Sequence, residues 1–141
     1  MTLNFDDTVT RPLTTDALIE ERIGALVGRA CRRQLWFLFL DEHDLQLPII
    51  MPVADPPRMP DGSVAALART IAEHVEDRAA RSVIIVLERY ADATFTAADA
   101  AWARALSDAF DQAGLPTRSV LVSHRNGVRW FAADDYRFGQ T

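Results

Sequence analysis

Three continuous apolar runs restrict most strongly how this chain can fold. They span residues 35–40, 83–87 and 119–123. None is long enough to cross a bilayer as a helix, and none alternates between apolar and polar residues as a strand with one wet face does. Continuous runs of this length are typical of strands that are buried on both faces. The chain therefore needs helices, or a partner, on both sides of a sheet.

Segments with helical spacing separate these runs. Apolar residues recur every three or four positions from about Thr15 to Ala30, across 64–80 and across 97–113. Thr96 fits the N-cap of the last segment and forms a capping-box pattern with an acid three residues later. Strands that alternate with helices are normally parallel and joined by right-handed crossovers. The pattern predicts an α/β fold.

Two further strands complete the predicted sheet. Residues 45–53 carry two prolines, which cannot donate to a ladder, so this strand belongs at an edge. Asn126-Gly127 predicts a tight type I′ hairpin that leads into 128–131. We expect a five-stranded mixed sheet in the order 2-1-3-4-5, with the three apolar runs parallel at its centre. Two helices would lie on one face and the first helix on the other.

The predicted sheet sets the domain organisation. We expect a flexible N-terminal arm over residues 1–13, a single α/β domain over 14–136 and a C-terminal tail over 137–141. One helix covers a face of five strands poorly, which leaves apolar surface for another molecule. We therefore expect a homodimer, with a protein partner as a further possibility.

Composition excludes several classes of function. All 15 basic residues are arginine, so a Schiff-base lysine and a complete phosphate loop ending in Gly-Lys-Ser/Thr are absent. A net charge of −5 disfavours a nucleic-acid binder. The first ten residues have neither the charged region nor the apolar core of a signal peptide. We expect a soluble cytoplasmic protein that does not insert into a membrane.

Polar residues follow each of the three apolar runs. Asp41 and Asp44 follow the first, Glu88 the second and His124 the third. Ligands bind beyond the carboxyl ends of parallel strands, so these groups could meet at one rim. Asp41, Glu88 and His124 would then be candidates for a catalytic site, and Asp41, Asp44 and Glu88 for a divalent cation. Charged residues at strand ends are more often solvated turns.

Two arginines at the same rim, Arg89 and Arg125, are candidates for binding a small anion. No nucleophile elbow and no dinucleotide-binding glycine motif occurs in the sequence. The leading hypothesis is a non-enzymatic module without a cofactor that self-associates. A metal-assisted hydrolase or nuclease-like enzyme, and an anion-binding protein, are the alternatives.

Three short motifs carry a resemblance to a known group of proteins. They are the run from Leu35 to Asp41, Leu47-Pro48, and the run from Gly127 to Trp130. In these motifs the stretch from Arg32 to Tyr136 resembles small uncharacterised actinobacterial α/β proteins. The resemblance implies the α/β fold and a bacterial source. It implies no activity and no site residue.

Overall fold

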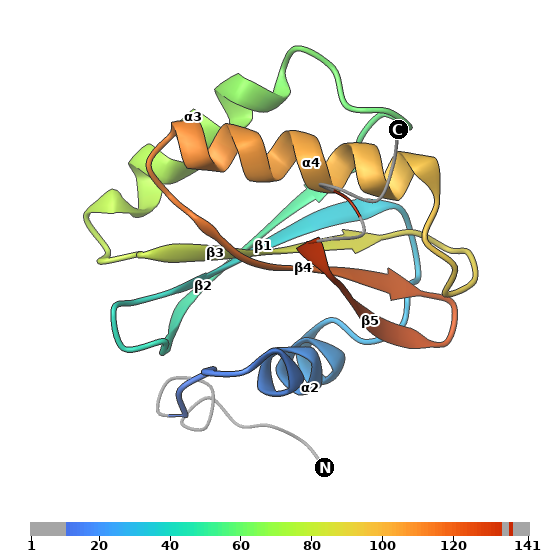
Figure 1. The fold of residues 1–141 in the computed structure, drawn as a ribbon, viewed down its shortest axis with the longest axis horizontal. Coiled ribbons are helices and arrows are strands. Elements are labelled where there is room, and N and C mark those ends of the chain that lie inside the picture. The colour runs from blue at the N-terminus through green and yellow to red at the C-terminus, as the bar shows by residue number, and fades with distance from the viewer. Residues whose placement is uncertain (1–10, 134–135, 137–141) are drawn as a thin grey trace.

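The computed structural model describes residues 11–133 and residue 136, and contains a five-stranded sheet with helices on both faces (Figure 1). The elements follow one another as α2 (Asp16–Leu26), β1 (Gln34–Leu40), β2 (Gln46–Ala54), α3 (Val64–Glu76), β3 (Ser82–Glu88), α4 (Ala97–Gln112), β4 (Thr117–His124) and β5 (Gly127–Phe131). None of these helices is long and apolar enough to cross a membrane.

The strand order β2-β1-β3-β4-β5 confirms the predicted order, and β3 and β4 are parallel as expected. The prediction that all three central strands are parallel is wrong for β1, which pairs antiparallel with both β2 and β3. The reason is the hairpin between β1 and β2, which reverses the chain before α3 begins. The crossover through α3 therefore makes β2 and β3 run the same way, with β1 between them in the opposite direction.

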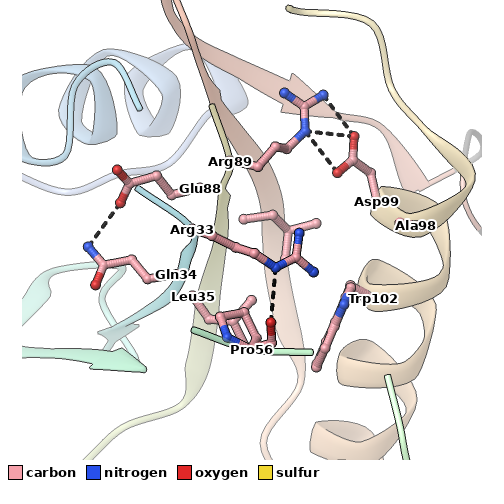
Figure 2. A pocket seen from close by; sticks show the side chains of 10 residues that line it. Arg33, Gln34, Leu35, Pro56, Glu88, Arg89, Ala98, Asp99 and Trp102 are labelled. Atoms are coloured by element: carbon pink, nitrogen blue, oxygen red, sulfur yellow. Dashed lines mark hydrogen bonds and ion pairs between the residues drawn. The ribbon is translucent and has the colours of Figure 1, made fainter. Parts of the chain in front are cut away.

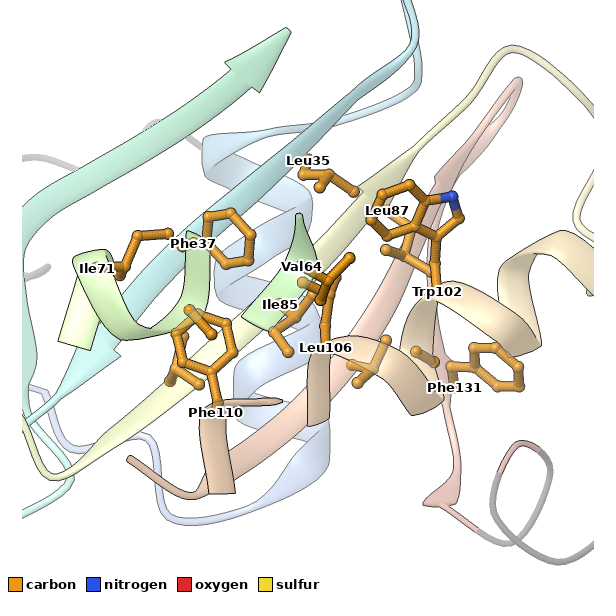
Figure 3. Close-up of a cluster of buried hydrophobic side chains, with 14 of the residues drawn as sticks. Leu35, Phe37, Val64, Ile71, Ile85, Leu87, Trp102, Leu106, Phe110 and Phe131 are labelled. Carbon is orange, nitrogen blue, oxygen red and sulfur yellow. The ribbon is translucent and has the colours of Figure 1, made fainter. Parts of the chain in front are cut away.

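The upper layer consists of α3 and α4, which pack side by side over one face of the sheet (Figure 1). Beneath them lies the larger core, in which the ring centres of Phe37 and Phe110 are 5.5 Å apart (Figure 3). The capping box is present at α4: Asp99 N–H donates to the Thr96 hydroxyl, and Thr96 N–H donates to the Asp99 carboxylate. These features confirm two helices on one face.

Of the described helices, α2 is the one on the opposite face, where it lies over β4 and β5 (Figure 1). Ile19 and Ile23 of α2 are fully buried in a smaller core. The helix is shorter than its apolar spacing predicts, because Gly28 adopts a φ of 71° just beyond its end. Most of the predicted N-terminal arm, and the tail over 137–141, fall outside the described residues. Leu13, the last residue of that arm, is 1% exposed and packs in the smaller core.

Both edges of the sheet are protected against further strand pairing. Pro48 and Pro52 lie on the edge strand β2 and remove two of the donors that this edge would otherwise present. At the other edge, the outward N–H of Trp130 on β5 donates to the Glu20 carboxylate of α2 at 2.9 Å. An additional strand therefore finds few free backbone donors at either edge.

The hairpin between β4 and β5 confirms the predicted pairing but not the predicted turn. His124 pairs with Gly127, so Arg125 and Asn126 form the loop and only Gly127 has a positive φ. A type I′ turn at Asn126-Gly127 needs positive φ at both residues. Instead, Arg125 N–H donates to the Ala91 carbonyl and Asn126 N–H to the His124 ring. These contacts favour a different turn from the one that local sequence indicates.

Candidate functional site

The antiparallel orientation of β1 separates the residues predicted to form one site. Leu40 pairs with Ser82, whereas Gln34 pairs with Glu88, so Asp41 follows β1 at the end of the sheet opposite Glu88. The seven residues of β1 span about 20 Å. Glu88 and His124 do share an edge, because β3 and β4 are parallel. The predicted convergence of Asp41, Glu88 and His124 is therefore wrong.

Asp41 organises the turn between β1 and β2. Its carboxylate accepts the backbone N–H groups of His43 at 2.8 Å and of Leu45 at 3.0 Å. Asp44 lies in the same turn with a φ of 61°. These two carboxylates stand at the far end of the sheet from Glu88, and the predicted metal set of Asp41, Asp44 and Glu88 does not assemble.

Glu88 lies at the other end and is 6% exposed. One carboxylate oxygen accepts the backbone N–H groups of Cys31 at 2.7 Å and Arg32 at 3.1 Å. The other accepts the side-chain N–H groups of Gln34 and Trp36, both at 2.9 Å. The pair with Gln34 is visible in Figure 2. Four donors occupy the four acceptor positions of a carboxylate, which leaves none for a metal ion or a substrate proton.

These contacts also determine the charge of Glu88. Burial on its own raises the pKa of this carboxyl, but the N–H groups of Cys31, Trp36, Gln34 and Arg32 outweigh burial and hold the pKa below its ordinary value. Glu88 is thus an anion that fastens the segment before β1 to the end of β3. Its role is therefore structural, because its hydrogen bonds join these two distant segments.

His124 closes β4 and is 9% exposed. Burial is the main cause that lowers the pKa of its imidazole, and the positive charges of Arg89 and Arg129 lower it further, against a smaller opposing effect of Asp92. The ring is therefore neutral at pH 7, and its Nδ1 accepts Asn126 N–H at 3.2 Å. Next to Glu88 on this edge, His124 supports the hairpin turn.

The two arginines predicted to bind an anion have partners within the protein. Arg89 forms a bidentate pair with Asp99, with Nη2 at 2.9 Å from the carboxylate (Figure 2). It also donates to the carbonyls of Asp92 and Thr94, which holds the loop between β3 and α4. The Arg125 guanidinium lies 5.3 Å from the ring centre of Tyr90. Arg89 therefore stabilises the loop between β3 and α4 at this edge of the sheet.

The same edge contains a hollow that sequence reasoning missed. It has a volume of about 510 Å³, which falls within the range of small-molecule sites. We call it the arginine hollow; its lining comprises Arg33, Arg58, Arg89, Tyr90, Ala91, Thr96, Ala97, Ala98 and Asp99. It continues inward into a recess of about 20 Å³ beside Leu35 and Trp102 (Figure 2). The sequence signal was the basic run that includes Arg33, together with a proline-rich loop that carries Arg58.

The chemistry available at this edge is that of permanent cations and hydrogen-bond donors. Among residues 11–133 and residue 136, no group of three His, Cys, Asp or Glu side chains is placed to hold a metal ion. Glu88 and His124, which are both buried, each form hydrogen bonds within the protein that fix their side chains. Compared with models of known protein families and with curated proteins, the chain shows no match to either.

Proposed function

We propose that this chain is a non-enzymatic bacterial binding module that forms a homodimer through the apolar face of β1 and β2. The supporting observation is the surface that α2 leaves uncovered. On this face Pro48, Ile50 and Pro52 of β2 are exposed, and Ile50 is 41% exposed. Trp36 of β1 lies directly opposite Pro52 and is only partly buried. We call these four residues the apolar face.

The position of the apolar face argues for packing of face against face. The alternate residues of β2 pack against the larger core, so the exposed set forms the other side of the strand. The prolines leave the β2 edge with few donors, which disfavours a dimer that extends the sheet. An uncharged surface with a tryptophan and an isoleucine suits a two-fold contact between identical copies.

The metal-assisted hydrolase has less support. Asp41 and Glu88 stand at opposite ends of β1, and the Glu88 carboxylate already accepts four hydrogen bonds. A protein partner on the apolar face, in place of a second copy, remains an outcome of the test below. The cytoplasm is the compartment that we propose for the module.

The test is the molar mass in solution, measured by light scattering coupled to size-exclusion chromatography. At roughly 50 µM, where dimers with micromolar dissociation constants are populated, we expect the mass of two chains. Ile50→Glu places a charge at the centre of the apolar face and should give a monomer.

Met59→Glu is the matched control, because Met59 is 49% exposed and lies outside the apolar face. It should leave the dimer intact. A wild-type monomer at this concentration would contradict the homodimer, and a monomeric wild type that binds a partner protein through Ile50 would replace it with a heteromeric contact. Equal masses for Ile50→Glu and wild type would show that another surface forms the dimer.

A further inference from the structure

We propose that the arginine hollow binds a phosphoryl group, either as inorganic phosphate or as the end of a phosphate monoester, through Arg33 and Arg58. This inference goes beyond the proposed function and concerns a different part of the molecule. The hollow lies at the carboxyl end of β3, whereas the apolar face lies on the α2 side of β1 and β2.

Arg33 is a partly buried cation that forms no ion pair with an acid among residues 11–133 and residue 136. Its Nε donates to the Pro56 carbonyl at 2.9 Å and its Nη2 to the Pro57 carbonyl at 2.7 Å. Within the described part of the chain, no carboxylate lies within 4.0 Å of its guanidinium. Figure 2 shows the guanidinium between the Arg89–Asp99 pair and Trp102. A partly desolvated charge that contacts only carbonyls favours an anion nearby.

Arg58 brings a second cation to the hollow from a rigid loop. Its backbone carbonyl accepts the indole N–H of Trp102 at 3.0 Å, and the same N–H reaches the Pro57 carbonyl at 3.1 Å. Three prolines within five residues restrict this loop further. The Arg58 side chain itself is exposed. Its main chain is thus fixed in advance, which reduces the entropy lost when a ligand binds.

The local charge has the opposite sign to the charge of the whole chain. Arg89 and Asp99 neutralise each other, so Arg33 and Arg58 give the lining a net charge of about +2, in a protein with a net charge of −5. A phosphate monoester carries about −1.5 to −2 at pH 7 and matches this charge. Arginine forks bind phosphate oxygens in pairs, so one phosphoryl group can accept hydrogen bonds from both residues.

The shape of the hollow limits the size of the ligand. The inner recess beside Leu35, Leu87 and Trp102 measures about 20 Å³, which is enough for one water molecule and too little for an organic tail. The outer part is lined by Ala97 and Ala98, whose small side chains leave room for oxygen atoms. The anionic head would therefore sit at the mouth, and any attached group would extend into solvent.

The test is a titration of the intact protein at constant ionic strength. Binding is detected by calorimetry and by changes in the amide NMR signals of Ala97 and Ala98. The probes are inorganic phosphate, phenyl phosphate and succinate. We expect saturable binding of a phosphoryl compound with local shifts at Ala97 and Ala98. Arg58→Gln should weaken it about tenfold, because one charge-assisted contact is lost.

Arg78→Gln is the matched control, since Arg78 is exposed and lies just beyond α3, before β3 begins. It should bind like wild type. Phenyl phosphate that binds at least as tightly as phosphate would identify the end of a monoester as a ligand, because the attached group then fits outside the hollow, and weaker binding of phenyl phosphate would identify phosphate itself. The proposal is overturned by the absence of saturable binding, by succinate binding as tightly as phosphate, or by an Arg58→Gln affinity equal to that of wild type.

Arg33→Gln provides a second measurement on the other cation. Arg33 also donates hydrogen bonds to the carbonyls of Pro56 and Pro57 and so holds this loop. The circular dichroism spectrum and the unfolding midpoint of the Arg33→Gln protein are therefore recorded first. A folded Arg33→Gln protein should lose phosphate affinity at least as strongly as Arg58→Gln. A folded variant with unchanged affinity would remove Arg33 from the site and contradict the two-arginine arrangement.

Discussion

At the scale of single residues, the buried carboxylate of Glu88 joins the segment before β1 to the carboxyl end of β3. Glu88 receives four hydrogen bonds from a segment more than fifty residues away in the sequence, and none from a cation. A buried carboxylate that is fully hydrogen-bonded stabilises a fold, whereas one that is partly bonded destabilises it. The backbone donors of Cys31 and Arg32 make this arrangement invisible to sequence patterns, since they carry no side-chain signal.

Glu88→Gln should destabilise the protein by roughly 3 kcal/mol, because an amide NH₂ replaces one acceptor oxygen and leaves two donors unpaired. Urea unfolding at pH 7 measures the loss. Glu73→Gln, on the exposed surface of α3, should change the free energy of unfolding by less than about 0.5 kcal/mol. Equal effects of the two substitutions would contradict a structural role for Glu88.

Lowering the pH should reduce the difference in unfolding free energy between wild type and Glu88→Gln. The pKa of Glu88 is lower in the folded state than its ordinary value of 4.5, so its contribution is present above pH 4.5 and is lost as the pH falls through the folded-state pKa. Unfolding curves at a series of pH values test this. A difference that stays constant down to pH 3 would exclude the ionised carboxylate as its cause.

His124 should make stability depend on pH in a higher range. Burial, with Arg89 and Arg129, lowers its pKa below 6.5, so the unfolded chain binds the proton more readily. Stability is then greatest above pH 6.5 and falls as the pH drops toward the folded-state pKa. His124→Asn, which keeps an acceptor for Asn126 N–H, should remove this component. His74→Asn, at an exposed position on α3, should retain it.

At the scale of elements, α4 is the helix whose beginning is best defined. Asp99 serves both the capping box and the bidentate pair with Arg89, so the start of the helix and the preceding loop depend on one carboxylate. The capping box was visible in the sequence, because Thr96 and Asp99 stand three residues apart. The pairing of Asp99 with Arg89 was not, because it depends on how the loop folds back.

Thr96→Ala should cost about 1 kcal/mol through loss of the N-cap hydrogen bond. Asp99→Ala should cost more, about 3 kcal/mol, because Arg89 is then left partly buried without its partner. Ser63→Ala is the control, since the Ser63 side chain makes no capping bond at α3. Denaturant unfolding of the three variants gives the order. If Asp99→Ala lowers the free energy of unfolding by no more than Thr96→Ala does, the dual role of Asp99 is contradicted.

At the scale of the whole molecule, the sequence predicted the strand order and the helix layers but not the direction of β1. Apolar runs and proline positions are local signals, and they placed each strand correctly in the sheet. Strand direction depends on which strand the crossover leaves, and here α3 leaves from β2 rather than from β1. The candidate site failed for the same reason, since reversing β1 carried Asp41 away from Glu88. Arg33 and Arg58 were missed because no pattern relates residues on separate loops.

The position of β1 between β2 and β3 has a consequence for the order of folding. The hairpin of β1 and β2 joins neighbouring segments, whereas the contact between Gln34 and Glu88 spans 54 residues and needs β3 in place. Long-range pairing is the slow part of assembling a sheet. The Glu88 hydrogen bonds need this pairing to be complete, so we expect their loss to act on the rate of unfolding more than on the rate of folding. We therefore expect this carboxylate to lengthen the lifetime of the native state once it has formed.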